Sequence, residues 1–330
     1  MKTYDLDVVV TRGEAVESLH RVHAAVVGPG DEVIGRAGDS DGFTFWRSCA
    51  KLFQIIPFIQ SGGFDALGWG DEQLAIACGS HGGEPEHVAL VERMLHDIGL
   101  EAGDLACGPH EPSSQRGAKI LRDSGERPNR LHNNCSGKHA SMLAYAHHSG
   151  WPHNGYEKKD HPVQRAILQE VSLWTDIPST KVVQAVDGCG TVVFGMSLER
   201  MARAYARFGA SASRGEESPR RVLAAMTAQP FLVGGTDRAD SILISATGGS
   251  VISKIGAEGL HCAMIPERGI GLAIKVEDGS QRAQVPALVR LLQELDALAE
   301  YPPAGLCAKK PIRNTRGECV GEVMMRADGR

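Results

Sequence analysis

Residues 249–279, GSVISKIGAEGLHCAMIPERGIGLAIKVEDG, contain three short apolar segments separated by glycine-containing turns. Segments of this length between glycine turns are typical of strands that follow one another in an antiparallel sheet. The residues that come next, 280–301, carry valine and leucine at helical spacing. The C-terminal part of the chain is therefore predicted to form three strands followed by a helix.

The N-terminal part predicts strands that could join the same sheet. Two alternating segments, residues 18–27 and 32–38, flank the turn GPGD at residues 28–31, which indicates an antiparallel hairpin. A helix is expected after it, beginning in FWRSCAKLFQ at residues 45–54.

The middle of the chain predicts helices. Four are expected, with Asp160, Ser197 and Ser218 as N-caps of the last three; they cover residues 84–100, 160–176, 197–208 and 218–229. The expected fold class is α/β, an antiparallel sheet built from both chain ends (residues 1–50 and 240–330) with a mainly helical region (residues 51–239) inserted. We expect the whole chain, residues 1–330, to form one catalytic domain.

The composition excludes several classes of partner. The net charge is −5 and no run of lysine and arginine could track nucleic-acid phosphates. The N-terminus lacks the apolar core of a secretory signal, and no stretch is long and apolar enough to span a bilayer. Eight scattered cysteines favour free thiols or a metal site over disulfides. We therefore expect a cytoplasmic protein with neither a nucleic-acid nor a membrane partner.

Ser48 and Lys51 are the first candidates for chemistry. Positions i and i+3 share one face of a helix, so a neutral lysine at 51 could take the proton of the Ser48 hydroxyl. Burial or a second cation would have to lower the lysine pKa from about 10.4. Chance alone gives roughly one such pair in a chain of this size, so the alternative is an ordinary helix face.

Two weaker motifs could complete this site. Ser80, in CGSHGGE at residues 78–84, lies between small residues just before an expected helix, although it could simply form a tight turn. Lys254, in SKIG at residues 253–256, lies on an expected strand with a glycine two positions later. Penicillin-recognising serine enzymes have a serine–lysine pair on a helix and a late Lys-x-Gly strand.

Two cysteine motifs suggest a metal site. Cys135, Lys138 and His139 lie together in HNNCSGKH, and Cys189 lies between two glycines in VDGCG. Two thiolates and a nitrogen suit zinc, and spacing alone favours His139 as the nitrogen ligand because lysine rarely binds zinc. Asp187 could orient a ligand or make a turn. The alternative is two unrelated buried cysteines.

Six motifs in this order resemble the asparaginase II family, the Rhizobium type of L-asparaginase: WRSCAK, ACGSHGGE, HNNCSGKHA, VDGCG, GGTDRAD and SKIGAEG. The resemblance covers nearly the whole chain. It implies a fold similar to serine β-lactamases and bacterial glutaminases, the hydrolysis of L-asparagine to L-aspartate and ammonia, and a homodimer.

The resemblance also implies residue roles. Ser48 would be the nucleophile and Lys51 its base, with Ser80 and Lys254 as a second serine–lysine pair that moves protons. Zinc would be the cofactor, bound by Cys135, Lys138 and Cys189 in place of the spacing-based choice of His139, and would orient the small-molecule substrate. The expected substrate-binding residues are Arg47, His139, Asp187 and Arg238. Asp237 stands where the family pattern leads us to expect glycine, which leaves the conformation of the Arg238 loop open.

Three other functions fit parts of this pattern. A penicillin-recognising serine hydrolase would use the same serine and lysines, but the cysteine motifs would have no role in such an enzyme. A glutaminase differs only in the length of the side-chain pocket. A zinc-stabilised binding protein would hold the metal and perform no chemistry.

Overall fold

A computed structural model describes residues 1–300, 302–303 and 305–326, which form two compact units. The first unit contains residues 1–49, 196–210 and the described residues from 253 onward, and the second contains residues 50–195 and 211–252. This division differs from the expected one, because residues 196–210 belong to the first unit and residues 240–252 to the second.

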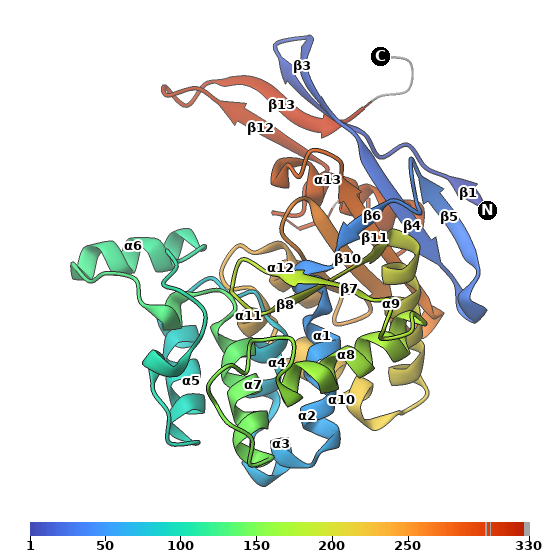
Figure 1. Cartoon of the computed structure of the whole chain (residues 1–330). Helices are drawn as coiled ribbons and strands as arrows, with labels where there is room; N and C mark the ends of the chain where they lie inside the picture. Colours follow the sequence, from blue (N-terminus) through green and yellow to red (C-terminus); the bar gives the residue numbers. More distant parts are fainter. Residues whose placement is uncertain (301, 304, 327–330) are drawn as a thin grey trace. The chain divides into compact units, whose positions relative to one another are not determined.

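A six-stranded sheet joins both chain ends in the first unit (Figure 1). Its order is β1 (Lys2–Thr3), β5 (Val33–Ala37), β4 (Val22–Val27), β11 (Ile270–Val276), β10 (Leu260–Ile265) and β9 (Ile252–Ile255). Strands β4 and β11 pair antiparallel with Ala25 opposite Ala273, and the hairpin of β4 with β5 is antiparallel as well. The α/β class and the sheet built from both ends are thus confirmed.

A second sheet in this unit was not predicted. Its strand order is β12 (Lys309–Arg313), β13 (Cys319–Met325), β2 (Val8–Arg12) and β3 (Ala15–His20). The segment 18–27, expected as one strand, is divided between β3 and β4. Strand β12 contains Pro311 and is partly exposed along its length, which fits its position at the edge of the sheet and explains why the sequence did not indicate it.

Two helices complete the first unit. Helix α13 (Gln281–Glu294) ends seven residues before the expected position. Its end is set by Asp296, whose φ of 51° is left-handed, and by the bond from Ala297 N to Leu292 O at 2.8 Å, as in a Schellman motif. Helix α9 (Leu198–Ser213) is bound to this unit at its start, where Leu198 N donates to Gly42 O at 3.2 Å.

Helices dominate the second unit, as predicted. They are α1 (Lys51–Gln54), α2 (Ile56–Gln60), α3 (Gly63–Ala66), α4 (Asp71–Cys78), α5 (Pro85–His96), α6 (Gln115–Ser124), α7 (Ser136–His148), α8 (Pro162–Thr175), α10 (Glu217–Ala228), α11 (Pro230–Val233) and α12 (Ala239–Ala246). A hairpin of β7 (Val183–Val186) and β8 (Val192–Ser197) lies between α8 and α9 in the chain. Strand β6 (Phe43–Phe45) and the 3₁₀ turn η2 (Arg47–Ala50) precede α1.

Helix α7 is buried along most of its length and packs closely on α4. A Cβ atom on Gly137 would lie 2.6 Å from Ile76 O, so only glycine allows this approach. Because α4 ends two residues before Ser80 and α7 begins directly after Cys135, this contact positions the two candidate regions within one unit.

Two of the expected N-caps are wrong. The side chain of His161, not Asp160, accepts from Val163 N at the start of α8, because the helix begins at Pro162. Ser218 lies inside the first turn of α10, whose N-cap is Glu216.

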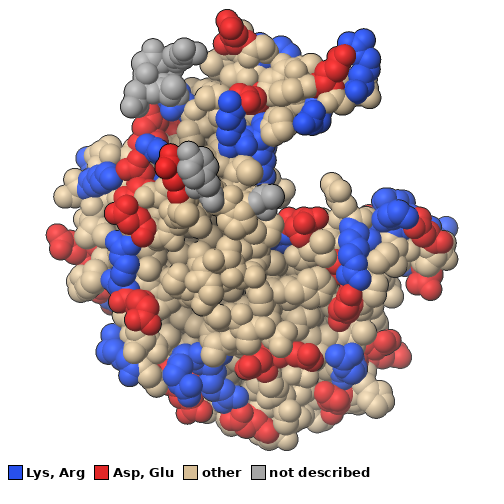
Figure 2. Space-filling model, turned by 180° about the vertical axis from the view of Figure 1, so that it is seen from behind, with Lys and Arg blue, Asp and Glu red and all other residues tan. Residues whose placement is uncertain are grey.

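Among the described residues, no helix is long and apolar enough to cross a membrane. Figure 2 shows acidic and basic side chains interspersed over the face that it displays, without a broad patch of either sign.

Candidate active site

Lys51 and Ser80 form a buried hydrogen-bonded pair in the second unit. Lys51 is 1% exposed and Ser80 is 4% exposed. The Lys51 Nζ donates to Ser80 Oγ at 3.0 Å, to Asn134 O at 3.5 Å, and to Gly79 O. The first residue of α1 therefore contacts the loop after α4 and the segment that leads into α7.

The loop that carries Ser80 is fixed by its backbone. Ser80 N donates to Val233 O at 2.8 Å, and His81 N donates to Asn134 O at 3.2 Å. The His81 imidazole also bonds Ser136 Oγ at 2.9 Å. These bonds hold the Ser80 hydroxyl in one place beside Lys51.

Ser48 and Lys254 belong to the first unit, where their segments contact each other. The Cys49 Sγ donates to Lys254 O at 3.0 Å, and the Tyr205 hydroxyl donates to Cys49 O at 2.7 Å. Strand β9, which carries Lys254, is thus bound to the turn η2, which carries Ser48. Cys49 is fully buried, which indicates a packing role. Each of the expected pairs, Ser48–Lys51 and Ser80–Lys254, contains one residue of the first unit and one residue of the second. Both pairs stay predictions.

Arg47, the residue before Ser48, has an unusual backbone conformation. Its φ of 48° lies in the left-handed region, which residues with a Cβ atom rarely occupy. Strain of this kind gathers at functional sites, where the surrounding structure maintains it. The position of Arg47 directly before Ser48 supports a functional role for the turn.

Cys135, Lys138 and Cys189 come together in the second unit. Cys135 directly precedes α7, Lys138 lies in its first turn, and Cys189 lies in the loop between β7 and β8. The Lys138 Nζ donates to Cys189 Sγ at 3.0 Å, and the two thiols are also within hydrogen-bond reach of each other. Two sulfurs and an amine nitrogen thus converge, and this donor set suits zinc.

The charges of this cluster are coupled. The hydrogen bond from Cys135 and the charge of the Lys138 ammonium lower the pKa of Cys189 to about 5. Burial acts in the opposite direction but is outweighed. The same thiol contact, together with burial, raises the pKa of Cys135 to about 12. Burial disfavours the Lys138 ammonium, but the neighbouring Cys189 outweighs it and the pKa of Lys138 is raised. The lowered pKa of Cys189 and the raised pKa of Lys138 both favour an ammonium–thiolate pair.

His139 and Asp187 lie beside this cluster. Burial, and then the Lys138 charge, lower the pKa of His139 to about 3, so its ring is neutral. The His139 Nδ1 lies 2.6 Å from the Tyr156 hydroxyl. The Asp187 side chain accepts from Gly188 N at 2.8 Å, and its backbone N–H donates to Thr191 O at 2.8 Å, which closes the loop that carries Cys189. No three histidine, cysteine, aspartate or glutamate side chains in the described ranges form a metal-binding group.

Glu84 links the Ser80 loop to the loop before Arg238. Its buried carboxylate accepts from Thr236 N at 2.7 Å, from Thr236 Oγ1 at 2.8 Å and from Arg116 at 2.6 Å. A Cβ atom on Gly235 would lie 2.6 Å from Glu84 Oε1, so glycine is required there. Asp237 adopts a φ of 56°, a conformation that suits the glycine expected at this position and that aspartate tolerates. The loop is therefore formed with Asp237 in place, and Arg238 precedes α12.

Replacing Glu84 by glutamine is expected to lower the free energy of unfolding by about 1–3 kcal/mol near pH 7, because charge-assisted bonds in a buried site are lost. Burial opposes the Glu84 charge, but Arg116 and Thr236 outweigh it and lower the pKa of Glu84. Its contribution is therefore present above the unfolded-state pKa of about 4.3 and disappears as the pH falls through the lower folded-state value. Denaturant titrations of the wild type and Glu84→Gln between about pH 7 and pH 3 show whether their free energies of unfolding become equal at low pH.

Glu86→Gln is the matched control. Glu86 binds the same Arg116 at 2.7 Å, but its side chain is 48% exposed, so the loss is expected to stay below about 1 kcal/mol. Equal destabilisation by both variants would contradict the role of Glu84 as the link between the two loops.

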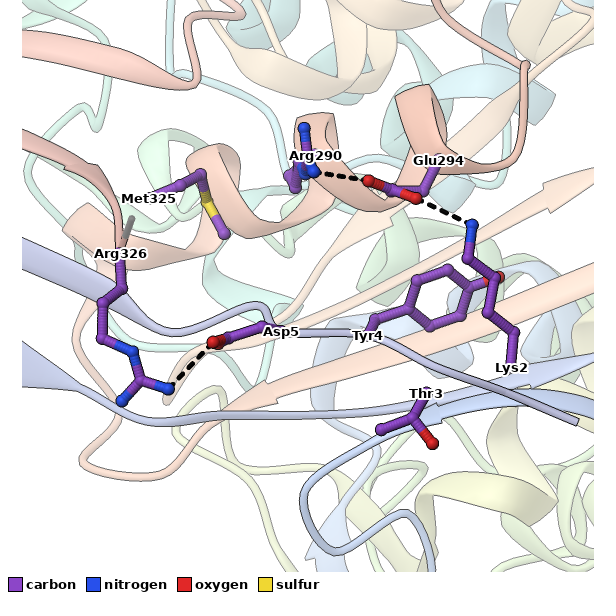
Figure 3. Close-up of a pocket in the computed structure, with 8 residues that line it drawn as sticks. All are labelled: Lys2, Thr3, Tyr4, Asp5, Arg290, Glu294, Met325 and Arg326. Atoms are coloured by element: carbon purple, nitrogen blue, oxygen red, sulfur yellow. Dashed lines mark hydrogen bonds and ion pairs between the residues drawn. The ribbon is translucent and has the colours of Figure 1, made fainter. Parts of the chain in front are cut away.

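A cavity of about 480 Å³ in the first unit is a separate feature (Figure 3). It is lined by Lys2, Thr3, Tyr4, Asp5, Arg290, Glu294, Met325 and Arg326. Its charged side chains pair with one another, Glu294 with Lys2 at 2.8 Å and with Arg290 at 2.5 Å, and Asp5 with Arg326 at 2.9 Å. None of the expected site residues lines it, so we do not assign it as the active site.

Sequence reasoning missed several residues of the site. The carbonyls of Gly79 and Asn134 bind Lys51, and no side-chain pattern could indicate them. Tyr156 lies 17 positions from His139, in a segment without a motif. Glu84 closes the quoted motif CGSHGGE, but an acidic residue before a helix ordinarily indicates only a cap.

Comparisons with known proteins give a family match and several structures of low sequence identity. Residues 8–325 match the L-asparaginase II family. No curated protein sequence matches the chain at a significant level. Among solved structures, Mglu in its native form is 14% identical, with 85% of this chain and 66% of that chain covered and a TM-score of 0.47.

Two further structures are similar. A beta-lactamase-like protein from Bacteroides dorei is 12% identical over 83% of this chain and 94% of that chain, with a TM-score of 0.43. A Bacillus glutaminase is 15% identical over 84% of this chain and 91% of that chain, with a TM-score of 0.34. The match to the family extends over nearly the whole sequence and includes every motif of the site, and the chain therefore belongs to the L-asparaginase II family of amidohydrolases.

Proposed function

We propose that the protein hydrolyses L-asparagine to L-aspartate and ammonia through an ester between Ser48 and the substrate. Family membership supports the reaction class. The observation that carries the chemistry is the buried contact of Lys51 Nζ with Ser80 Oγ at 3.0 Å, because a buried lysine bonded to a serine is what proton transfer at a hydroxyl requires.

The reaction has two covalent steps. In the first, Ser48 Oγ bonds the side-chain amide carbon of asparagine while Lys51 takes the serine proton. The carbon–nitrogen bond then breaks, and the proton leaves with ammonia. In the second step, water attacks the β-aspartyl ester, Ser48 regains a proton, and aspartate is released.

Lys51 is suited to act as the base in this scheme. A carbonyl oxygen can only accept, so the bonds to Gly79 O and Asn134 O use two N–H groups of the amine. In the deprotonated form that a base requires, the Lys51 amine would keep two N–H groups and gain one lone pair, which can accept the proton of a serine hydroxyl. We assign Ser80 and Lys254 to the return of the proton to the leaving group.

Zinc fits the cluster of Cys135, Lys138 and Cys189 through its two sulfurs and one nitrogen. When bound, it would supply positive charge that binds and orients the substrate. Asp187 closes the loop that carries Cys189 through its backbone bond to Thr191 O, and we assign it to holding Cys189 in place. Arg47 and Arg238 supply positive charge for the α-carboxylate of the substrate.

Removal of zinc is expected to raise KM for asparagine severalfold with a smaller change in kcat, because the metal positions the substrate in this scheme. The measurement is steady-state ammonia release before and after dialysis against a chelator, with metal content determined on the same samples. Cys189→Ser should purify without metal and behave like the chelated protein.

The matched control for this cluster is Cys107→Ser. Cys107 is a neighbouring buried thiol that contacts Arg130 O at 3.8 Å, and we expect this variant to retain its metal. A large loss of kcat with KM unchanged after chelation would contradict a positioning role and favour a metal-activated water.

Ammonia release from asparagine tests the proposed function directly. The same assay on glutamine decides between the two amides, which differ by one methylene, and hydrolysis of nitrocefin would favour a penicillin-recognising enzyme. Metal binding without hydrolysis of any of these substrates would contradict an enzymatic role at this site.

A further inference from the structure

The imidazole of His139 has one ring nitrogen paired and one free. His139 and Tyr156 are 0% and 1% exposed. The Nδ1 lies 2.6 Å from the Tyr156 hydroxyl oxygen, whereas Nε2 has no hydrogen-bond partner among the described residues. A buried polar atom without a partner needs an explanation, and a bound ligand is one.

The neighbouring bonds determine where the ring proton lies. The backbone N–H of Ala106 donates to the Tyr156 oxygen at 2.9 Å, so this oxygen is an acceptor. The Tyr156 hydroxyl proton then has Nδ1 of His139 as its acceptor in the described part of the chain. Because Nδ1 accepts, a neutral His139 carries its proton on Nε2.

The opposite tautomer is disfavoured. With the proton on Nδ1, the Tyr156 oxygen would accept two hydrogen bonds and its own O–H would be buried without an acceptor. The desolvation of such a donor disfavours this state by roughly tenfold or more.

We propose that Tyr156 is a positioning residue that holds His139 as the Nε2–H tautomer, so that His139 presents a preformed donor to an oxygen of the bound amino-acid amide. The part about the substrate rests on the proposed function. The part about Tyr156 rests on the bonds of Ala106, Tyr156 and His139 alone.

Two features favour an oxygen acceptor over a metal at Nε2. A metal would bind the lone pair of Nε2, which exists only in the disfavoured tautomer with the proton on Nδ1. The effect of the Lys138 charge on His139 is also larger than the opposing effects of Cys135 and Glu157, so the free N–H has a cationic neighbour. A carboxylate or amide oxygen suits such a region.

Nuclear magnetic resonance of protein with ¹⁵N-labelled histidine tests the first part. Long-range proton–nitrogen correlations identify which ring nitrogen carries the proton, and the spectrum of His139→Gln assigns the signal among the 13 histidines. We expect His139 of the wild type to be protonated at Nε2, both before and after addition of zinc. A wild-type ring protonated at Nδ1, or a change of tautomer on adding zinc, would overturn the proposal without any variant.

Tyr156→Phe tests the second part. It removes the bond to Nδ1, so a second tautomer should appear in the spectrum and KM for asparagine should rise roughly tenfold with a smaller change in kcat. Tyr145→Phe is the control, since Tyr145 is also buried and its hydroxyl has no hydrogen bond to any described residue. It should leave both the tautomer and KM unchanged.

The outcomes separate the two proposals. A Tyr156→Phe variant that keeps the single Nε2–H tautomer and the wild-type KM overturns the role of Tyr156. A wild type that hydrolyses neither asparagine nor glutamine contradicts the proposed function, while the tautomer spectra still decide whether Tyr156 positions His139.

Discussion

Ser48→Ala is expected to lower kcat for L-asparagine by about four orders of magnitude or more, because it removes the oxygen that forms the ester. The fold should persist, since the substitution removes one hydroxyl at the start of a helical segment and leaves Trp46 and Cys49 buried on either side. Ammonia release measures the activity, and thermal unfolding together with metal content shows that the variant is otherwise intact.

Ser61→Ala is the matched control for this variant. The Ser61 hydroxyl donates to Phe58 O at 2.8 Å at the end of α2 and accepts from Gly63 N at 3.3 Å, and it is not a site residue, so turnover should stay close to that of the wild type. Near-normal turnover in Ser48→Ala would refute the assignment of the nucleophile. Ser80, which contacts Lys51 directly, would then become the first residue to test.

Lys51→Met is expected to cost about as much activity as Ser48→Ala, because the nucleophile then has no base. The two residues act as one unit in the proposed mechanism, so the double variant should be no slower than either single variant. Methionine has a similar shape, but Gly79 O, Asn134 O and Ser80 Oγ lose a donor, and we expect a loss of about 1–3 kcal/mol in the free energy of unfolding.

Lys119→Met provides the comparison on the surface. Lys119 is 71% exposed and pairs with Asp123 one turn along α6, so neither activity nor stability should change measurably. Losses that add in the double variant Ser48→Ala/Lys51→Met would show that the two side chains act independently, which the mechanism does not allow.

The sheet was predictable because its signals are local. Glycine turns and short apolar segments indicate strands without knowledge of their partners, and the GPGD turn indicates a hairpin. The edge strand β12 was missed because Pro311 and partial exposure conceal the pattern. The end of α13 was misplaced because leucine continues at helical spacing beyond Asp296, whose left-handed conformation cannot be inferred from that spacing.

The site was predictable in its residue types and less so in its contacts. Motif order brought Lys51 and Ser80 into one hypothesis, but the place of the Ser80 loop is set by backbone bonds to Val233 and Asn134, which are distant in the chain. Spacing alone favoured His139 as the nitrogen ligand, whereas in the structure Lys138 contacts Cys189 and His139 contacts Tyr156. The two residues are consecutive in α7 and point about 100° apart around the helix, and spacing does not resolve which of them faces a distant loop.

The left-handed backbone of Arg47 has a consequence for efforts to improve the protein by selection. Glycine at this position would relieve strain of about 1–2 kcal/mol, so a library screened only for survival after heating would enrich it. The same change would free the turn that carries Ser48 and remove a cationic side chain. A screen for heat resistance should therefore also measure turnover, because otherwise it will select stable variants without activity.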